Sequence, residues 1–248
     1  MPVSLLAAPQ DWPPENQAFP IREIDIRVSD EDPVGLQRFD AEVASNWERE
    51  KAANPHLFNG RLVALNEVKL CDGAVRATGQ LVPYAYHLWW RRQDQKPRTF
   101  HSFGMPVIRS SDGAIIAIRM SSITANAGKV YCASGSLEED DIVDGRIDLD
   151  ANMAREVAEE TGLALDDMEP EPDYFCAWCG QIVMFYRFFQ SSVEAAGLME
   201  RVRDHMRRDT EGEIDAVLAI TGDNRDDFDY AHSMPPVLDL VFGRRGRG

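Results

Sequence analysis

Cysteine is scarce in this sequence, and its four copies are widely scattered at Cys71, Cys132, Cys176 and Cys179. This excludes a disulfide framework of the kind that supports small secreted domains. Cys176 and Cys179 have CxxC spacing, but no second CxxC and no histidine pair in the sequence completes a zinc site. The flanking segments YFCAW and IVMFYRFF are typical of strands. We therefore expect two small, mostly buried side chains in or near a strand pair.

Long apolar runs are also missing. None reaches the roughly 20 residues that a membrane-spanning helix needs. The first residues, MPVSLLAAPQDW, carry no basic leader before their short apolar stretch, which argues against a secretory signal. Hydrophobic residues make up 44% of the 248-residue chain and charged residues 27%, an ordinary globular balance. We expect a cytoplasmic protein with no membrane partner.

Basic residues are few. Lys and Arg number 26 against 42 Asp and Glu, so the formal net charge is -16. Such a surface repels phosphate backbones, and no nucleic-acid partner is expected. The acidity is uneven, because 15 Asp or Glu lie between Glu138 and Asp173 with only Arg146 and Arg155 among them. A concentration of this kind indicates either a solvated segment or a cation site.

The first part of the chain, residues 1–98, predicts a small α+β module. Residues 1–20 are rich in proline and polar residues and are expected to form an extended arm. Alternating and helical apolar spacings then follow in turn. They predict a strand at 21–28, a helix from about 35 to 53, strands at 61–70 and 74–81, and a helix at 83–93.

The second part, residues 99–248, mixes antiparallel hairpins with helices and predicts an α+β or α/β sandwich. Its expected strands are a pair within 105–122, one entering an acidic loop at 129–141, a pair within 173–190, and one at 213–220. Its expected helices are 148–163, 192–209 and 233–242.

One helix carries a cluster of acids in the segment REVAEETGL, residues 155–163. At helical spacing Glu156, Glu159 and Glu160 share one side, which fits a solvated face. Two details favour a cation site instead. Glu156 and Glu160 are four residues apart and repel each other. Gly162 has the character of a helix-ending glycine, which places Glu159 and Glu160 in a last turn that favours cations. Physics alone leaves both interpretations open.

REVAEETGL resembles the second half of the Nudix box, R-E-U-x-E-E-x-G-U with U an aliphatic residue, and matches every specified position. The surrounding order of elements is similar to that family over about residues 100 to 245. The resemblance implies the Nudix fold, an α/β/α sandwich with a mixed sheet between helices.

The first half of the box departs from the family pattern. Gly135 is followed after five residues by Asp141, where the family has a glutamate. Thirteen residues, instead of seven, then precede Arg155, and Ile147 occupies the position eight residues before it. The loop is therefore about six residues longer than usual, with VDGRID inserted. In the family that first glutamate mainly braces the loop against the helix.

The resemblance also implies chemistry. Nudix proteins hydrolyse a nucleoside diphosphate linked to another group X (NDP-X), using Mg²⁺ or Mn²⁺. By resemblance Glu156, Glu159 and Glu160 are metal ligands, Glu159 being catalytic as well, and a backbone carbonyl near Ser134 or Gly135 adds another ligand. Arg155 is then a partner that orients a glutamate of its own helix.

Further site residues are expected outside the box. Glu211 and Glu213, in the segment DTEGEID, are candidates for an additional ligand or a general base, although each alone is typical of a surface. Arg119 either contacts phosphate or lies at a strand edge. His205 and His232 have no partner at an informative spacing and are read as structural or exposed.

The segment SNWEREKAANPHLFNGRLVAL is similar to the N-terminal region of UDP-glucose-hydrolysing Nudix proteins of animals, which suggests a UDP-sugar substrate. The aromatic cluster after it, Tyr84, Tyr86, Trp89 and Trp90, either stacks on a base or packs the modules together, and we expect packing. Alternative functions are hydrolysis of ADP-ribose, a dinucleotide or a nucleoside triphosphate, or ligand binding with little catalysis. The expected partner is a small-molecule nucleotide, and the resemblance allows a homodimer.

Overall fold

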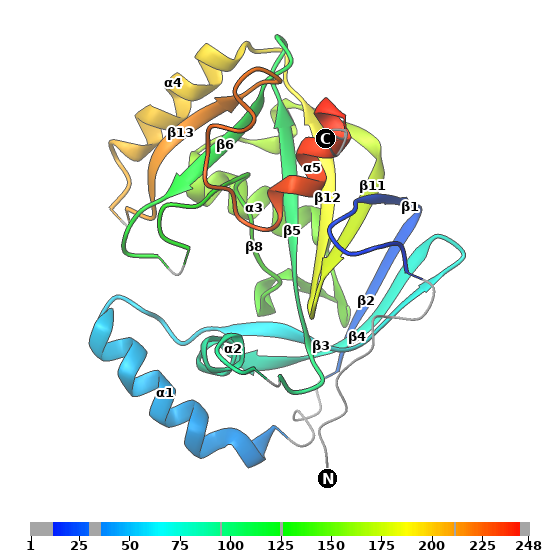
Figure 1. The fold of residues 1–248 in the computed structure, drawn as a ribbon, viewed down its shortest axis with the longest axis vertical. Helices are drawn as coiled ribbons and strands as arrows, with labels where there is room; N and C mark the ends of the chain where they lie inside the picture. The colour runs from blue at the N-terminus through cyan, green and yellow to red at the C-terminus, as the bar shows by residue number, and fades with distance from the viewer. Residues whose placement is uncertain (1–11, 30–35, 95, 125, 211, 244–248) are drawn as a thin grey trace.

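The computed structural model describes residues 12–29, 36–94, 96–124, 126–210 and 212–243. Its strands join into one mixed sheet that runs through both predicted parts of the chain (Figure 1). The central strand is β5 (Phe100–Arg109), which lies parallel to β12 (Ile182–Gln190) along its whole length. β11 (Glu169–Cys179) pairs with β12 on its other side, and β1 (Phe19–Ile21) pairs with β11.

The other edge of β5 has three different neighbours along its length. β3 (Arg61–Cys71) pairs at its beginning, β8 (Gly135–Ser136) in its middle, and β6 (Ile115–Met120) at its end. β6 then pairs with β7 (Val130–Tyr131) and β13 (Ile214–Ile220). Because these neighbours diverge from β5, the sheet is split on this side, and β8 lies between the two branches.

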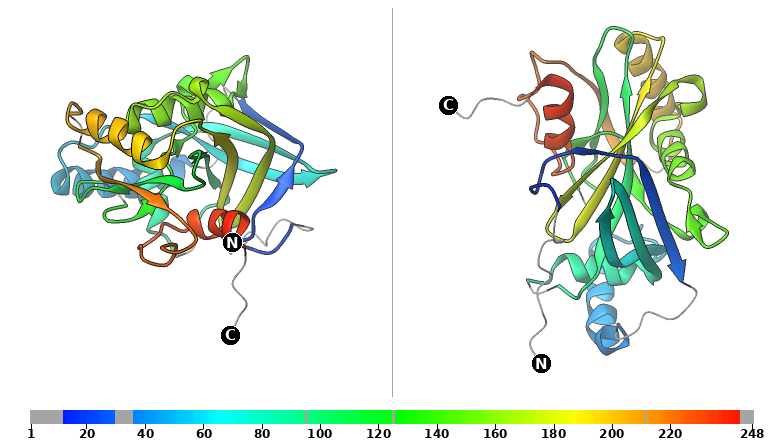
Figure 2. Two further views of the ribbon diagram at one scale, coloured as in Figure 1. Left: turned by 90° about the horizontal axis from the view of Figure 1, so that it is seen from above. Right: turned by 90° about the vertical axis from the view of Figure 1, so that its right-hand side faces the viewer.

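We call the branch with β6, β7 and β13 the upper branch and the branch with β3 the lower branch. Helices cover both faces of the upper branch (Figure 2). α3 (Leu149–Thr161) and α4 (Ala195–Met206) lie on one face, and α5 (Met234–Phe242) lies on the other. α3 approaches β5 closely at Gly104, where an added Cβ would lie 2.8 Å from Asn152 Oδ1. The expected mixed sheet between helices is confirmed. Short 3-10 turns occur at Gln37–Phe39, Glu139–Asp141 and Leu165–Asp167.

The N-terminal part adds the lower branch of the sheet. β4 (Ala74–Pro83) pairs with β3, and β2 (Glu23–Ser29) pairs with β4. α1 (Asp40–Ala53) and α2 (Tyr84–Arg91) pack beside them. Tyr86, Trp89 and Trp90 are buried in this small second core, which the N-terminal part forms almost by itself. The expected packing of the two parts against each other by the aromatic cluster stays a prediction.

The inserted loop residues form a hairpin of their own. β9 (Ile142–Val143) and β10 (Arg146–Ile147) are joined by Asp144 and Gly145, both with positive φ, as a tight hairpin turn requires. β10 pairs with β2, and the Gly145 carbonyl accepts a hydrogen bond of 2.9 Å from the Val28 amide. The insertion therefore extends the lower branch of the sheet.

Most sequence expectations hold to within a few residues, with three differences. β11 begins at Glu169, earlier than expected. The strand expected to enter the acidic loop within 129–141 is only the short β7. After β7 the chain stops pairing with β6 and pairs with β5 instead, as β8. Within the expected N-terminal arm, residues 19 and 20 belong to β1, and residues 1–11 lie outside the described residues.

The cysteines and the apolar segments agree with the sequence analysis. Cys176 is buried and Cys179 half-buried on β11, and all four cysteines are free. Within the described ranges, no helix combines the length and the apolar character needed to cross a membrane.

Candidate active site

The acidic segment REVAEETGL forms the second half of α3. The helix begins at the N-cap Asp148, whose carboxylate accepts a hydrogen bond of 3.0 Å from the Ala151 amide. It ends at Gly162, which adopts the left-handed conformation at φ 67°. The expected helix-ending glycine is confirmed. His205 of α4 forms a hydrogen bond of 2.9 Å through Nε2 to the Glu159 carbonyl, satisfying an acceptor of the last turn.

The three glutamates do not share one environment. Glu159 is solvent-exposed, with 59% of its side chain accessible. Glu156 is buried, with 8% of the residue accessible. Glu160 is half-buried and accepts a hydrogen bond of 3.0 Å from the Ser134 amide. The interpretation of all three as a solvated helix face is therefore wrong for Glu156 and Glu160.

Burial changes the acidity of these two side chains. Loss of solvation raises the pKa of Glu156 to about 7, although the Arg155 guanidinium opposes the rise. Loss of solvation, together with the nearby Glu156 carboxylate, also raises the pKa of Glu160 well above its ordinary value, although the Ser134 amide opposes the rise. Two adjacent carboxylates that resist ionisation form a strong potential binding site for a cation.

The loop before the helix lies directly on these carboxylates. A Cβ at position 135 would lie 2.1 Å from the Glu156 carboxyl group, so any side chain larger than that of glycine would displace this carboxylate. The neighbouring Ser134 supplies the amide that holds Glu160. Gly135 and Ser134, the predicted source of a backbone ligand, are thus in contact with two of the predicted metal ligands.

Arg155 forms ion pairs with three acidic side chains. Its guanidinium lies 2.7 Å from Glu156 and 3.1 Å from Glu159, both on its own helix, and 3.2 Å from Asp141 of the loop. Only a quarter of the Arg155 side chain is exposed. These contacts hold the glutamates of the helix against the loop, and a catalytic role for Arg155 stays a prediction.

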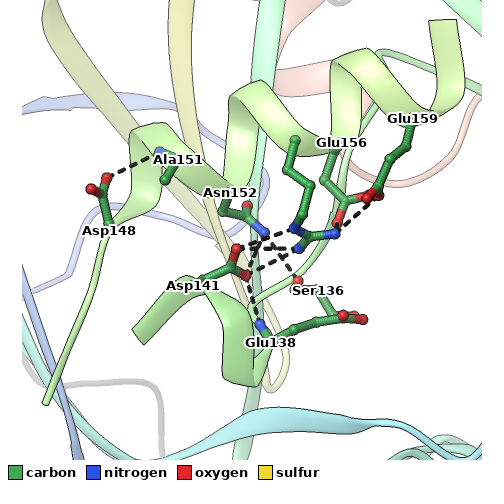
Figure 3. Close-up of polar contacts among 9 residues, drawn as sticks. Ser136, Glu138, Asp141, Asp148, Ala151, Asn152, Glu156 and Glu159 are labelled. Carbon is green, nitrogen blue, oxygen red and sulfur yellow. Dashed lines mark hydrogen bonds and ion pairs between the residues drawn. The ribbon is translucent and has the colours of Figure 1, made fainter. Parts of the chain in front are cut away.

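Asp141 connects the loop to the helix. It is 2% exposed and accepts hydrogen bonds from the Asn152 side-chain amide at 2.9 Å and the Glu138 backbone amide at 2.7 Å, as well as pairing with Arg155 (Figure 3). The signal for Asp141 in the sequence was its position six residues after Gly135, which survives the insertion.

The hairpin insertion leaves this arrangement intact because the residue that follows the hairpin lies beside the residue that precedes it. The Asp148 amide donates a hydrogen bond of 2.8 Å to the Asp141 carbonyl. Residues 142–147 therefore form a hairpin that projects from the chain between the end of the loop and the start of the helix. The extra length shifts the spacing in the sequence without separating Asp141 from Arg155.

The donor set fits Mg²⁺ or Mn²⁺ in kind, since the carboxylates of Glu156 and Glu160 lie against the loop at Gly135 and Ser134 and offer oxygen ligands. In the described part of the chain, however, no three acidic, histidine or cysteine groups converge as a ready set of ligands. Arg155 occupies oxygens of Glu156 and Glu159 instead. A divalent ion would have to compete with Arg155 for these two carboxylates.

A cavity of about 410 Å³ opens beside the glutamates. Its lining includes the loop residues 134–136, of which Gly135 contacts Glu156 and Ser134 contacts Glu160. The rest comes mainly from α2, from β5 and from the segment before α5. The lining includes Tyr84, His87, Trp90, Arg91, His101 and Phe103.

Sequence reasoning missed most of this cavity. Trp90 and His232 both line the cavity. From the sequence, Trp90 was expected to pack the modules together in preference to stacking on a base, and His232 was read as structural or exposed. No spacing in the sequence links α2 to residues 231–233, because they meet only through the folded sheet.

The other predicted site residues lie apart from the cavity lining. Glu213, at the start of β13, is close enough for its carboxylate to contribute to the raised pKa of Glu160. Arg119 forms an ion pair of 2.7 Å with Asp215 at the strand surface, and its assignment to phosphate stays a prediction. Glu211 lies outside the described residues.

No protein-family model matches the chain, and no curated protein matches it. Several solved structures are similar to part of it. A MutT protein from Methanosarcina mazei is 17% identical, with 57% of this chain and 92% of that one covered at a TM-score of 0.39. A Nudix hydrolase from Nitrosomonas europaea is 18% identical, with 59% and 91% covered at 0.40. An Ap4A hydrolase from C. elegans is 12% identical, with 56% and 93% covered at 0.39. Identities and TM-scores this low carry no argument about activity, and the function must be argued from the site.

Proposed function

We propose that this protein is a Nudix-type hydrolase that cleaves a nucleoside diphosphate linked to another group, with Mg²⁺ or Mn²⁺ bound at Glu156, Glu159 and Glu160. The observation that carries the proposal is the shared loop. Ser134 and Gly135 contact the Glu160 and Glu156 carboxylates, respectively, and also line the cavity of about 410 Å³. A substrate in that cavity would therefore lie beside the acidic cluster.

The chemistry explains why buried acids are placed there. A divalent ion, when bound, supplies positive charge against phosphate oxygens and lowers the pKa of water. The protein's part is to hold oxygen ligands in a fixed arrangement. Glu156 is held by burial and Glu160 by the Ser134 amide, and Arg155, anchored by Asp141, keeps Glu159 near them.

Within this class we propose a UDP-sugar as the substrate, on the similarity of the segment SNWEREKAANPHLFNGRLVAL to UDP-glucose-hydrolysing relatives. ADP-ribose, dinucleotides and nucleoside triphosphates are the alternatives that a substrate screen separates. A ligand-binding protein with little catalysis is favoured by one observation, the ion pairs that Arg155 makes with Glu156 and Glu159.

The test is a hydrolysis screen of nucleotide sugars, ADP-ribose, dinucleotides and nucleoside triphosphates, with Mg²⁺ or Mn²⁺ and with EDTA. We expect release of a nucleoside monophosphate from a diphosphate substrate, and no release in EDTA. Glu159→Gln should lower turnover by about a hundredfold, because it removes a metal ligand. The matched control is Glu200→Gln, an exposed glutamate of α4 that also pairs with arginine, and it should retain full turnover.

Three outcomes would contradict the proposal in different ways. Turnover that persists in EDTA would remove the metal from the mechanism. Turnover that survives Glu159→Gln would remove this residue from the site. Binding of nucleotides without hydrolysis of any diphosphate would favour the ligand-binding alternative.

A further inference from the structure

The formally charged residues that line the cavity are both basic. Arg91 lies in the last turn of α2, and Lys96 lies in the segment that follows this helix. In the part of the chain that the structure describes, no aspartate or glutamate belongs to the lining. The whole chain has the opposite bias, with 42 acidic residues against 26 basic ones. The cavity therefore favours an anionic ligand, although the molecule as a whole repels one.

Neither of these two cations is neutralised by a carboxylate of another described residue. The Arg91 guanidinium donates a hydrogen bond of 3.3 Å to Oδ1 of Asn126, which is a neutral group. The Lys96 ammonium donates a hydrogen bond of 2.9 Å to the Gln93 carbonyl and lies 5.3 Å from the centroid of the Trp90 ring. Both side chains thus keep their positive charge and further N–H donors for a ligand.

The arginine next to Arg91 is held differently. Arg92 lies outside the cavity lining, and its guanidinium forms an ion pair of 2.5 Å with Glu50 of α1. Both arginines are exposed at the end of the same helix. The one outside the cavity is paired with an acid, and the one that lines the cavity is not. Stabilisation of the helix end alone does not account for this difference.

The charge of Arg91 acts on lining residues from several elements. Loss of solvation lowers the pKa of each lining histidine, and the Arg91 charge contributes to the shift; these histidines are His87, His101 and His232. The imidazoles are therefore neutral near pH 7, and the two cations supply the positive charge. Burial and the Glu160 carboxylate raise the pKa of Tyr131, whereas Arg91 opposes the rise. Tyr131 is thus influenced by both the acidic cluster and Arg91.

We infer that Arg91 and Lys96 bind a phosphate group of the substrate and form a second anion site beside the acidic cluster of α3. The inference rests on the proposed function and gives the N-terminal part of the chain a role in positioning the substrate. A guanidinium presents a planar set of N–H donors that matches phosphate oxygens, and an ammonium adds a point charge. A metal ion at the glutamates and these two cations then share the negative charge of the diphosphate.

Calorimetric titration of the metal-free full chain with pyrophosphate at low salt tests this inference. Protein and ligand are freed of metal on a chelating resin, because a dissolved chelator is itself an anion that competes for the site. Arg91→Gln and Lys96→Gln should each weaken binding about tenfold. Arg91→Lys keeps the charge and loses the planar donor set, so it should weaken binding less than Arg91→Gln. Added salt should weaken binding to the wild type.

Arg92→Gln is the matched control, because it removes a positive charge from the same helix end outside the cavity. It should leave the affinity for pyrophosphate unchanged. Lys96 also packs over the Trp90 ring, so Arg91→Gln, which changes an exposed side chain, carries the test if Lys96→Gln fails to fold. Absence of pyrophosphate binding to the wild type, or equal affinity in the wild type, Arg91→Gln and Arg92→Gln, would overturn the inference.

Hydrolysis kinetics separate this inference from the proposed function. With a diphosphate that the protein cleaves, Arg91→Gln should raise KM about tenfold and leave kcat within about threefold of the wild type. Pyrophosphate binding that depends on Arg91 in a chain that hydrolyses no diphosphate supports the anion site and counts only against the hydrolase. Hydrolysis with an unchanged KM in Arg91→Gln rejects the anion site and leaves the hydrolase intact.

Discussion

At the scale of single residues, the site is built from side chains that cost stability in the absence of a cation. Glu156 is buried and Glu160 half-buried against the loop, and the Glu156 carboxylate makes ionisation of Glu160 harder. Arg155 offsets part of this cost for Glu156, and the Ser134 amide offsets part of it for Glu160. Such a cost is typical of a functional site, where stability is exchanged for binding.

Glu160→Gln should therefore stabilise the metal-free protein while it abolishes turnover. The pKa of Glu160 is raised in the folded state, so its favourable contribution is present at low pH and is lost as pH rises above the ordinary glutamate range. The glutamine keeps an acceptor for Ser134 and carries no charge. Thermal unfolding in EDTA should show a gain of roughly 2–4 °C at about pH 8 and less at about pH 5.

The control for this measurement is Glu200→Gln, because an exposed carboxylate on α4 carries no desolvation penalty. It should leave the difference in Tm between the two pH values unchanged. A Glu160→Gln protein that is no more stable than the wild type at about pH 8 would mean that the carboxylate is not desolvated.

At the scale of elements, the inserted hairpin joins the two parts of the chain without entering the site. β10 pairs with β2, and a hydrogen bond from the Asp148 amide to the Asp141 carbonyl joins the two ends of the hairpin. The Asp141 contacts with Arg155 and Asn152 lie outside the hairpin. The insertion therefore covers an edge of the lower sheet branch, which protects unpaired backbone groups.

Gly145→Val should loosen β2 while sparing catalysis. Gly145 has φ 74°, a conformation that strains a β-branched residue by about 1–2 kcal/mol. The Val28 amide loses its acceptor when the hairpin opens, so its hydrogen exchange should accelerate about tenfold, with turnover within about threefold of the wild type.

Gly113→Val is the matched control, because Gly113 also has positive φ, at 86°, and also lies in a turn with open space around it. It strains a turn between β5 and β6, far along the sheet from β2. Equal acceleration at Val28 in both variants would point to general destabilisation and contradict a specific role for the hairpin.

At the scale of the whole molecule, the predicted modules share one sheet. β3 pairs with β5 at Ala64 and Leu65, while β1 pairs with β11 at the far edge. The cavity also takes lining residues from both parts. The division of the chain into parts 1–98 and 99–248 stays a prediction. A homodimer likewise stays a prediction.

A fragment of residues 99–248 should therefore fail to form a cooperative native state. It would expose the edge of β5 that β3 covers and the edge of β11 that β1 covers. Near-ultraviolet circular dichroism and thermal unfolding should show weak tertiary signal and a broad transition, compared with a sharp transition for the full chain. A cooperative transition in the fragment would establish it as an autonomous domain.

Much of the fold and part of the site follow from local pattern. The spacing of apolar residues identified the helices and hairpins, and Gly162 marked the end of α3 because that position needs positive φ. REVAEETGL marked the acidic helix, since its placement of acids conflicts with helix electrostatics. These features depend on neighbours within a few residues, which a sequence displays directly.

The tertiary structure alone decided which acids are buried and what surrounds them. Glu156 and Glu160 are set apart from Glu159 by the loop that packs over them, and Asp141 reaches Arg155 despite a longer spacing. The cavity brings residues near 90 beside residues near 232. Burial, solvation and contact at such separations depend on how the sheet folds the chain back on itself, and no local periodicity encodes them.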